Sequence, residues 1–121
     1  MAHNFLKPAV IWTIAITVAS LASFTKMPKV TVPGKDKTVH FVFYFVLVLL
    51  WFLALKSKHD NKKIIFYIAV SAILYGILME IMQWLFTQNR QADFYDIIAN
   101  TLGVFLAVLT IYLFSTKTKT I

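Results

Sequence analysis

The chain has 121 residues, of which 60% are hydrophobic and only 14% are charged, and its formal net charge is +7. Its mean hydropathy is +0.75. This balance excludes an ordinary soluble domain and predicts a membrane protein. The lack of cysteine excludes disulfides and thiolate metal sites. The lysines form short runs beside apolar segments, so we expect membrane lipids with anionic headgroups, and no nucleic acid, as partners.

Four long apolar stretches follow one another along the chain. Each comes close to the roughly 20 residues that a helix needs to cross a hydrocarbon core about 30 Å thick. None alternates polar and apolar residues with a period of two, which argues against the strands of a membrane barrel. We therefore predict an all-α membrane protein, a four transmembrane helix bundle that forms a single domain over residues 1–121. The expected helices are residues 8–24, 38–55, 64–86 and 94–114.

The first stretch is also compatible with a signal peptide, because the small residues of "VASLAS" follow an apolar segment that Lys7 precedes. Either interpretation places the N-terminus on the cytoplasmic side. The loop "KSKHDNKK" is the densest basic element and should remain in the cytoplasm. We therefore expect a multi-pass protein with both termini cytoplasmic. The second and fourth helices then begin, and the third ends, at the outer face.

Polar residues gather near this outer end of the last three helices. Within each helix they are three, four or seven residues apart, so each set shares one helical face. A charge that faces lipid at this depth is costly, so the faces should turn toward one another and form a polar pocket open to the outer leaflet. The sets are Lys37, His40 and Tyr44 in the second helix, Glu80 and Gln83 in the third, and Asp93, Asp96, Asn100 and Gly103 in the fourth.

Counting residues from the expected helix ends predicts how these side chains are layered, at a rise of about 1.5 Å per residue. Tyr44, Glu80 and Asn100 should share one layer. The layer above should contain His40, Gln83 and Asp96. The lip of the pocket should consist of Asp36, Lys37, Arg90 and Asp93.

The order and spacing of these residues resemble the VanZ-like family of small bacterial membrane proteins, named for an accessory factor in teicoplanin resistance. The resemblance lies in "DKTVHFVFY", "EIMQ" and "RQADFYDIIANTLG". It implies a bacterial cytoplasmic (inner) membrane and a link to cell-envelope lipids or lipid-bearing antibiotics. The residues that match the family pattern are Asp36, Lys37, His40, Tyr44, Glu80, Gln83, Arg90, Asp93, Asp96, Asn100 and Gly103.

Three classes of function are compatible with such a pocket. The first is a binding protein that takes the headgroup of an envelope lipid, such as a lipid-linked precursor, or a lipoglycopeptide, with Lys37 and Arg90 contacting phosphate or carboxylate. The second is an enzyme that modifies such a lipid, with His40 as general base or nucleophile and Glu80 or Asp96 orienting it. The third is a transporter or small channel subunit; the inner half lacks polar residues for a path, although an oligomer could provide one. We favour the first.

Simpler roles compete with these for the same residues. Asp36 and Asp93 stand where the N-caps of the second and fourth helices belong. His40 could be a structural histidine bonded to Glu80 or Asp96. No cofactor is expected. Four candidate metal ligands, His40, Glu80, Asp93 and Asp96, are present, but a single histidine argues against zinc, so no metal is expected either.

Two further features concern packing. Gly76 and Gly103 both fall near the bilayer midplane, where small residues let helices approach closely. We therefore expect the third and fourth helices to meet through these glycines and to point Glu80 toward Asn100. The aromatic residues Trp51, Trp84, Phe94 and Tyr95 are expected at the lipid-facing surface and in interfacial belts.

Overall fold

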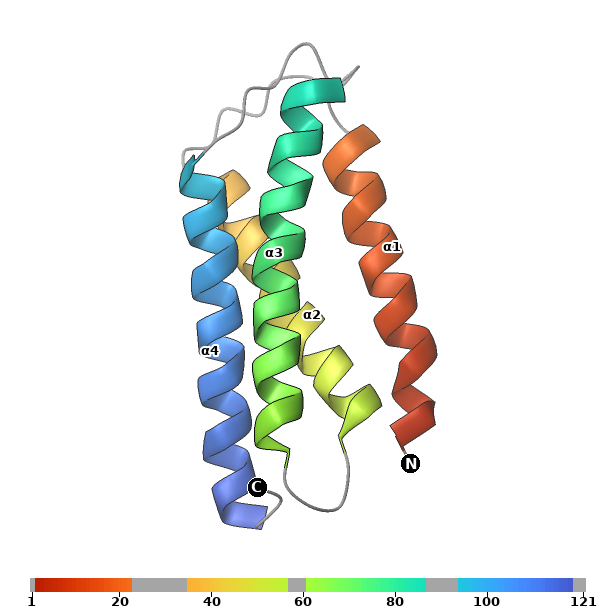
Figure 1. Ribbon diagram of the computed structural model, residues 1–121, viewed down its shortest axis with the longest axis vertical. Helices are drawn as coiled ribbons and strands as arrows, with labels where there is room; N and C mark the ends of the chain where they lie inside the picture. The colour runs from red at the N-terminus through yellow and green to blue at the C-terminus, as the bar shows by residue number, and fades with distance from the viewer. Residues whose placement is uncertain (1, 23–34, 57–60, 87–93, 119–121) are drawn as a thin grey trace.

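The protein is described here by a computed structural model, which covers the backbone of residues 2–22, 35–56, 61–86 and 94–118 and side chains within 4–21, 38–56, 61–85 and 95–114. The described chain is entirely helical, as predicted (Figure 1). A short 3-10 helix, η1 (Ala2–Phe5), leads into the first of four α-helices. These are α1 (Leu6–Ala22), α2 (Lys35–Leu55), α3 (Lys62–Phe86) and α4 (Phe94–Thr118).

The helices agree with the predicted ranges except near their ends. The α2 helix begins at Lys35, and α4 continues to Thr118. The prediction followed apolar residues only, whereas a membrane helix can continue among charged residues at the headgroup level. Asp36 consequently lies within the first turn of α2, so the expectation that it caps this helix is wrong. Asn61, which directly precedes α3, accepts a backbone hydrogen bond from Ile65 at 2.9 Å.

Three of the helices are long and apolar enough to cross a membrane. Their apolar spans are Thr38–Leu55, Lys62–Leu85 and Tyr95–Phe114, with mean hydropathies of 2.4, 2.2 and 2.2. The α1 helix has 17 residues, and its apolar part, Leu6–Leu21, is shorter than the other three. The described chain therefore has three helices that are long and apolar enough to span a membrane and a shorter apolar helix beside them. A fourth crossing by α1 stays a prediction.

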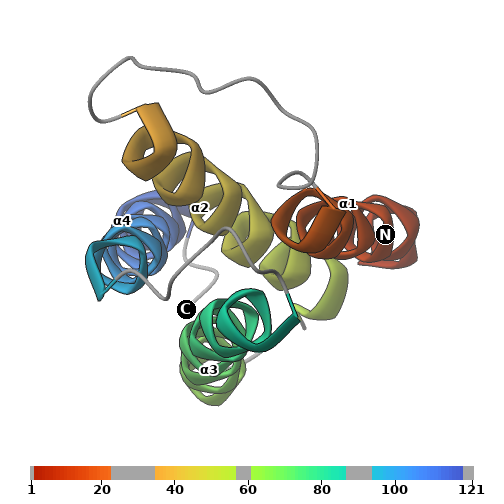
Figure 2. The same cartoon turned by 90° about the horizontal axis from the view of Figure 1, so that it is seen from above.

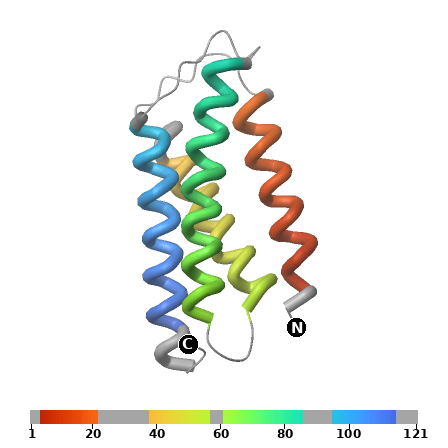
Figure 3. Tube along the Cα trace, in the orientation of Figure 1, coloured from red at the N-terminus to blue at the C-terminus, as the bar shows by residue number. Residues whose placement is uncertain are grey.

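The α2 helix is the centre of the bundle, because it packs against each of the other three and most extensively against α4. It crosses obliquely between α1 and α4, while α3 lies along one side of it (Figure 2). Further contacts join α3 to α4 and α1 to α3. The described chain begins, and α4 ends, at the end of the bundle where α2 ends and α3 begins (Figures 1 and 3). This arrangement agrees with termini on one side of a membrane.

Burial in this bundle is the reverse of that in a soluble protein. Large apolar side chains cover the outside, including Ile11, Phe66 and Phe114, each 63–64% exposed. An apolar core that includes Phe52, Ile65 and Ile111 fills the end of the bundle near the termini. Polar residues are buried instead, mainly toward the other end. They are Ser20, Asn61, Glu80, Gln83, Asp96 and Asn100. Since lipid solvates apolar surface but not carboxylates, this pattern is typical of a membrane-embedded protein.

Both glycines are buried in helix contacts, but they do not pair as predicted. A Cβ atom on Gly103 would lie 2.4 Å from the Phe41 carbonyl oxygen, so this glycine brings α4 against the backbone of α2. A Cβ atom on Gly76 would lie 2.9 Å from Asn100 Nδ2 and 3.3 Å from Tyr44 Cε2. The prediction paired the glycines because both fall near the bilayer midplane, whereas α4 packs chiefly on α2. Gly76 nonetheless brings α3 against Asn100 of α4.

Candidate functional site

Four polar side chains from three helices meet near the end of the bundle away from the termini, and we call them the polar cluster: His40 of α2, Glu80 of α3, and Asp96 and Asn100 of α4. His40 Nδ1 lies 3.1 Å from Asn100 Oδ1. On the other edge of the ring, His40 Nε2 lies 3.6 Å from Asp96 Oδ2. One ligand atom from each of His40, Glu80 and Asp96 falls within 4.8 Å of the others. The predicted convergence of these faces is therefore observed.

The polar cluster is almost completely enclosed. Glu80 and Asp96 are 1% exposed and Asn100 is 2% exposed, while the His40 side chain retains 13%. Burying two carboxylates is expensive unless opposite charge or hydrogen bonds compensate. Asp96 gains some compensation from its place in the first turn of α4, where the helix dipole favours negative charge. Where the structure describes lysine side chains, all are exposed: Lys7, Lys56, Lys62 and Lys63.

The predicted layers are shifted by about one turn on α3. Glu80 belongs with His40 and Asp96, whereas Gly76, one turn earlier, is level with Asn100. Gln83 lies a turn beyond the polar cluster and donates from Nε2 to the Ser20 carbonyl oxygen of α1, at 2.9 Å. The prediction assumed that the outer ends of the helices lie at the same depth in the membrane, but α3 extends past the start of α4 (Figure 1). Placing Gln83 beside His40 and Asp96 was therefore wrong.

Tyr44 lies directly below the polar cluster. It is 1% exposed, and its ring packs beside Gly76 and at 6.1 Å from the ring of Tyr75.

The side chains of the four residues predicted at the lip of the pocket are not described. Arg90 and Asp93 lie outside the described residues, and the side chains of Asp36 and Lys37 do too, although both belong to α2. Their role at the lip stays a prediction.

Sequence reasoning missed the contribution of α1. The pattern that could have predicted it is a set of hydroxyl residues, spaced by four and then three on an otherwise apolar helix, which are Thr13, Thr17 and Ser20. The Tyr75 hydroxyl donates to the Thr13 carbonyl oxygen at 3.2 Å and also contacts Thr17 Oγ1. Hydrogen bonds of this kind join membrane helices where lipid offers no competing partner.

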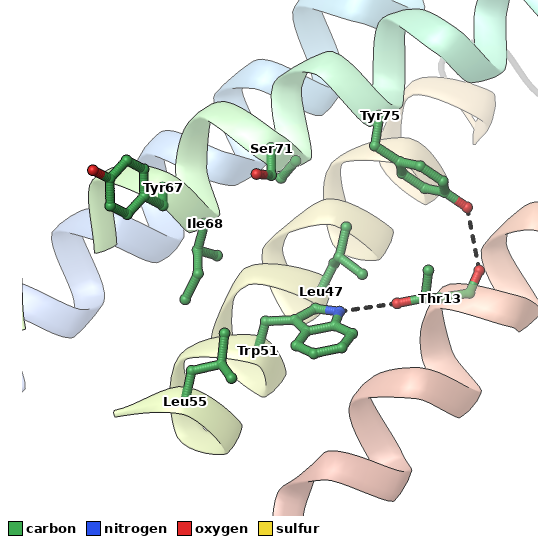
Figure 4. Close-up of a pocket in the computed structure, with 9 residues that line it drawn as sticks. Thr13, Leu47, Trp51, Leu55, Tyr67, Ile68, Ser71 and Tyr75 are labelled. Carbon is green, nitrogen blue, oxygen red and sulfur yellow. Dashed lines mark hydrogen bonds between the residues drawn. The ribbon is translucent and has the colours of Figure 1, made fainter. Parts of the chain in front are cut away.

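The α1 contacts also correct one aromatic prediction. Trp51 is half-buried, and its Nε1 donates to Thr13 Oγ1 at 2.9 Å (Figure 4), so it joins α2 to α1 rather than facing lipid. Trp84 and Tyr95 are 59% and 68% exposed, as predicted for lipid-facing side chains. The Phe94 side chain lies outside the described residues.

Two apolar cavities open on the surface of the bundle. One, which we call the α2–α4 groove, measures ≈ 520 Å³ and lies on faces of α2 and α4 adjacent to those that carry the polar cluster. The other, the α1–α3 pocket, measures ≈ 320 Å³ (Figure 4). The groove is lined by Thr38, Phe41, Tyr95, Ile98, Ala99 and Leu102. The pocket is lined mainly by Leu47, Trp51, Ile68, Ser71, Ala72 and Tyr75, with Thr13, Leu55 and Tyr67 at its edges.

An apolar exterior around carboxylates, an amide and an imidazole defines a class of multi-pass membrane protein with a polar site between its helices. This chain belongs to the VanZ/LLP1 family, whose model matches residues 4–115 and thus includes the whole polar cluster. The resemblance drawn from the sequence motifs is confirmed.

The chain is also similar to a curated protein of Schizosaccharomyces pombe (strain 972 / ATCC 24843), "Uncharacterized protein C11E3.10". The two are 30% identical over 105 residues, which cover 85% of this chain and 61% of that protein. The chain thus spans about three fifths of the length of this relative. No solved structure matches the chain.

Proposed function

We propose that this protein binds the headgroup of a cell-envelope lipid, or of a lipoglycopeptide antibiotic, at the polar cluster. The observation that carries the proposal is the convergence of His40, Glu80, Asp96 and Asn100 from three helices inside an apolar exterior. Buried ionisable groups are costly in a membrane and are usually retained for function. A bundle held together for stability alone would need only the neutral contacts that α1 already makes.

An amphiphile needs a place for its chain as well as for its headgroup. The α2–α4 groove supplies an apolar surface of suitable size on the two helices that contribute His40 and Asp96. His40 is the most exposed member of the polar cluster and directly precedes the groove residue Phe41 on α2. A lipid whose chain occupies the groove can thus extend its headgroup past His40 toward the carboxylates.

The membrane concerned is, on this proposal, the bacterial cytoplasmic membrane. The end of the bundle where α2 ends and α3 begins, which flanks the basic sequence "KSKHDNKK", faces the cytoplasm on this proposal, and the opposite end, with the polar cluster, faces the outer leaflet. Lipid-linked precursors and lipoglycopeptides are both accessible from that leaflet. With this location, we propose a role in teicoplanin resistance or in envelope homeostasis, which is what the family resemblance implies.

A second candidate function is a lipid-modifying enzyme. His40 Nδ1 faces an amide oxygen and Nε2 faces a carboxylate, which orients the ring as a general base would require. Transport by a single chain is less well supported, because the described core on the side of the termini is apolar.

Native mass spectrometry of protein extracted gently from its host membrane tests both candidates. We expect a retained lipid on the wild type and at least tenfold less of it on Glu80→Gln, since the amide keeps the shape of the side chain but removes its charge. Leu85→Ala is the matched control, because Leu85 is 60% exposed on the same helix. Equal retention by the wild type and Glu80→Gln would contradict binding at the polar cluster. A lipid whose mass changes during incubation only with intact His40 would indicate the enzyme.

A further inference from the structure

The arrangement of His40, Glu80 and Asp96 brings three candidate metal ligands together. One ligand atom from each lies within 4.8 Å of the others, and His40 Nε2 and Asp96 Oδ2 are 3.6 Å apart. Ligand atoms at about 2.1 Å from one ion lie roughly 3.0 to 3.4 Å apart when they are neighbours. A contraction of a few tenths of an ångström would therefore bring the observed pair onto a common ion.

The histidine is held in the orientation that metal binding needs. An amide oxygen can only accept a hydrogen bond, so the 3.1 Å contact requires His40 Nδ1 to donate to Asn100 Oδ1. In the neutral ring that donates from Nδ1, the lone pair of Nε2 is directed toward the Asp96 carboxylate, 3.6 Å away. Metal-bound histidines almost always donate a hydrogen bond from the N–H of their other ring nitrogen to an oxygen in this way.

The charge balance favours a cation in the same place. Glu80 and Asp96 are each 1% exposed, so their charges are held away from water. A divalent cation would neutralise both carboxylates and remove the repulsion between them.

We propose that His40, Glu80 and Asp96 bind one hard divalent cation of the Mn²⁺ or Mg²⁺ type, with Asn100 orienting the histidine. Two carboxylates and one imidazole form an oxygen-rich set, which suits these ions better than zinc. The expectation of no metal rested on the weakness of a one-histidine zinc site, and that argument does not apply to a hard cation. Three protein ligands leave positions open for water or for an anionic group.

Manganese itself is the probe, because free Mn²⁺ has a strong solution EPR signal that disappears on binding. The purified full-length chain, treated with EDTA and then freed of it, should bind one Mn²⁺ per chain. Asp96→Asn and Glu80→Gln should each weaken binding at least tenfold, and Asn100→Leu should do so less, as a residue that acts through His40. Trp84→Phe, on the exposed face of α3, is the control and should bind as the wild type does.

A second measurement identifies the histidine directly. Pulsed EPR of the bound Mn²⁺ should show coupling to an imidazole nitrogen that disappears in His40→Gln. Binding that is unaffected by all three ligand substitutions, absence of nitrogen coupling in the wild type, or no bound Mn²⁺ at millimolar concentration would each overturn the proposal. Both measurements are made without lipid, so they can fail while lipid binding persists, and the site goes beyond the proposed function.

Discussion

At the scale of single residues, His40 is the side chain on which the site depends. Its ring joins α2 to α4 twice, through Asn100 on one edge and Asp96 on the other, and it keeps 13% of its surface exposed. Asn100 also contacts α3, because its side chain fills the space that Gly76 leaves open. His40 and Asn100 together therefore connect α2, α3 and α4.

Residue types and spacings were enough to predict which side chains gather, because charge avoids lipid and helical periodicity assigns faces. His40, Glu80, Asp96 and Asn100 were identified in this way. Their positions along the axis of the bundle were not predicted correctly, because the sequence does not say how far α3 extends beyond α4. Gln83 was therefore placed a turn too low, and its bond to Ser20 was missed.

At the scale of helices, the contact between α2 and α4 determines whether the polar cluster can form. Gly103 permits it, because any side chain there would meet the backbone of α2 at Phe41, which cannot rotate away. Gly76 is less constrained, since its nearest neighbour is the end of the Asn100 side chain. The sequence predicted that both glycines would be buried in contacts but gave the wrong partner for Gly103, because it contains no information on which helices cross.

Gly103→Ala should therefore destabilise the bundle more than Gly76→Ala. We expect a loss of about 1 to 3 kcal/mol for Gly103→Ala, the usual cost of overpacking, with normal membrane insertion. The free energy of unfolding of each glycine variant is measured by titration with a denaturing detergent. Leu102→Ala, which replaces an exposed neighbour in the α2–α4 groove, is the control. Equal stability of the two glycine variants would show that α2 and α4 are not in close backbone contact.

At the scale of the whole molecule, an outer-leaflet site requires that the polar cluster and the termini lie at opposite faces of the membrane. The structure places the start of the described chain and the end of α4 beside the end of α2 and the start of α3, at the end of the bundle opposite to the start of α2, which carries His40 (Figures 1 and 3). Composition predicted the membrane class correctly, and its apolar runs predicted the helices. The 17 residues of α1 were counted as a full span, although that helix also serves to bond α2 and α3.

Single cysteines can test the orientation, because the chain has none of its own. A cysteine at Lys63, which is exposed at the start of α3, should be protected from an impermeant thiol reagent in intact cells. One at Gln91, in the loop before α4, should react. Asn61 is a poor choice at the first face, because it is 0% exposed and would be protected in either orientation. Labelling of Lys63→Cys but not of Gln91→Cys would show that the topology is reversed and would exclude an outer-leaflet site.

The most direct test of the central claim, that the polar cluster is a ligand site, is NMR of the histidine rings in lipid nanodiscs. The chain has three histidines, and His3 and His59 serve as internal references for general effects of the lipid. On adding lipid extracted from the host envelope, the His40 ring resonances should shift in the wild type and stay unchanged in Glu80→Gln. If no lipid fraction shifts His40 while the other two rings remain normal, the polar cluster is structural and the proposed binding function is wrong.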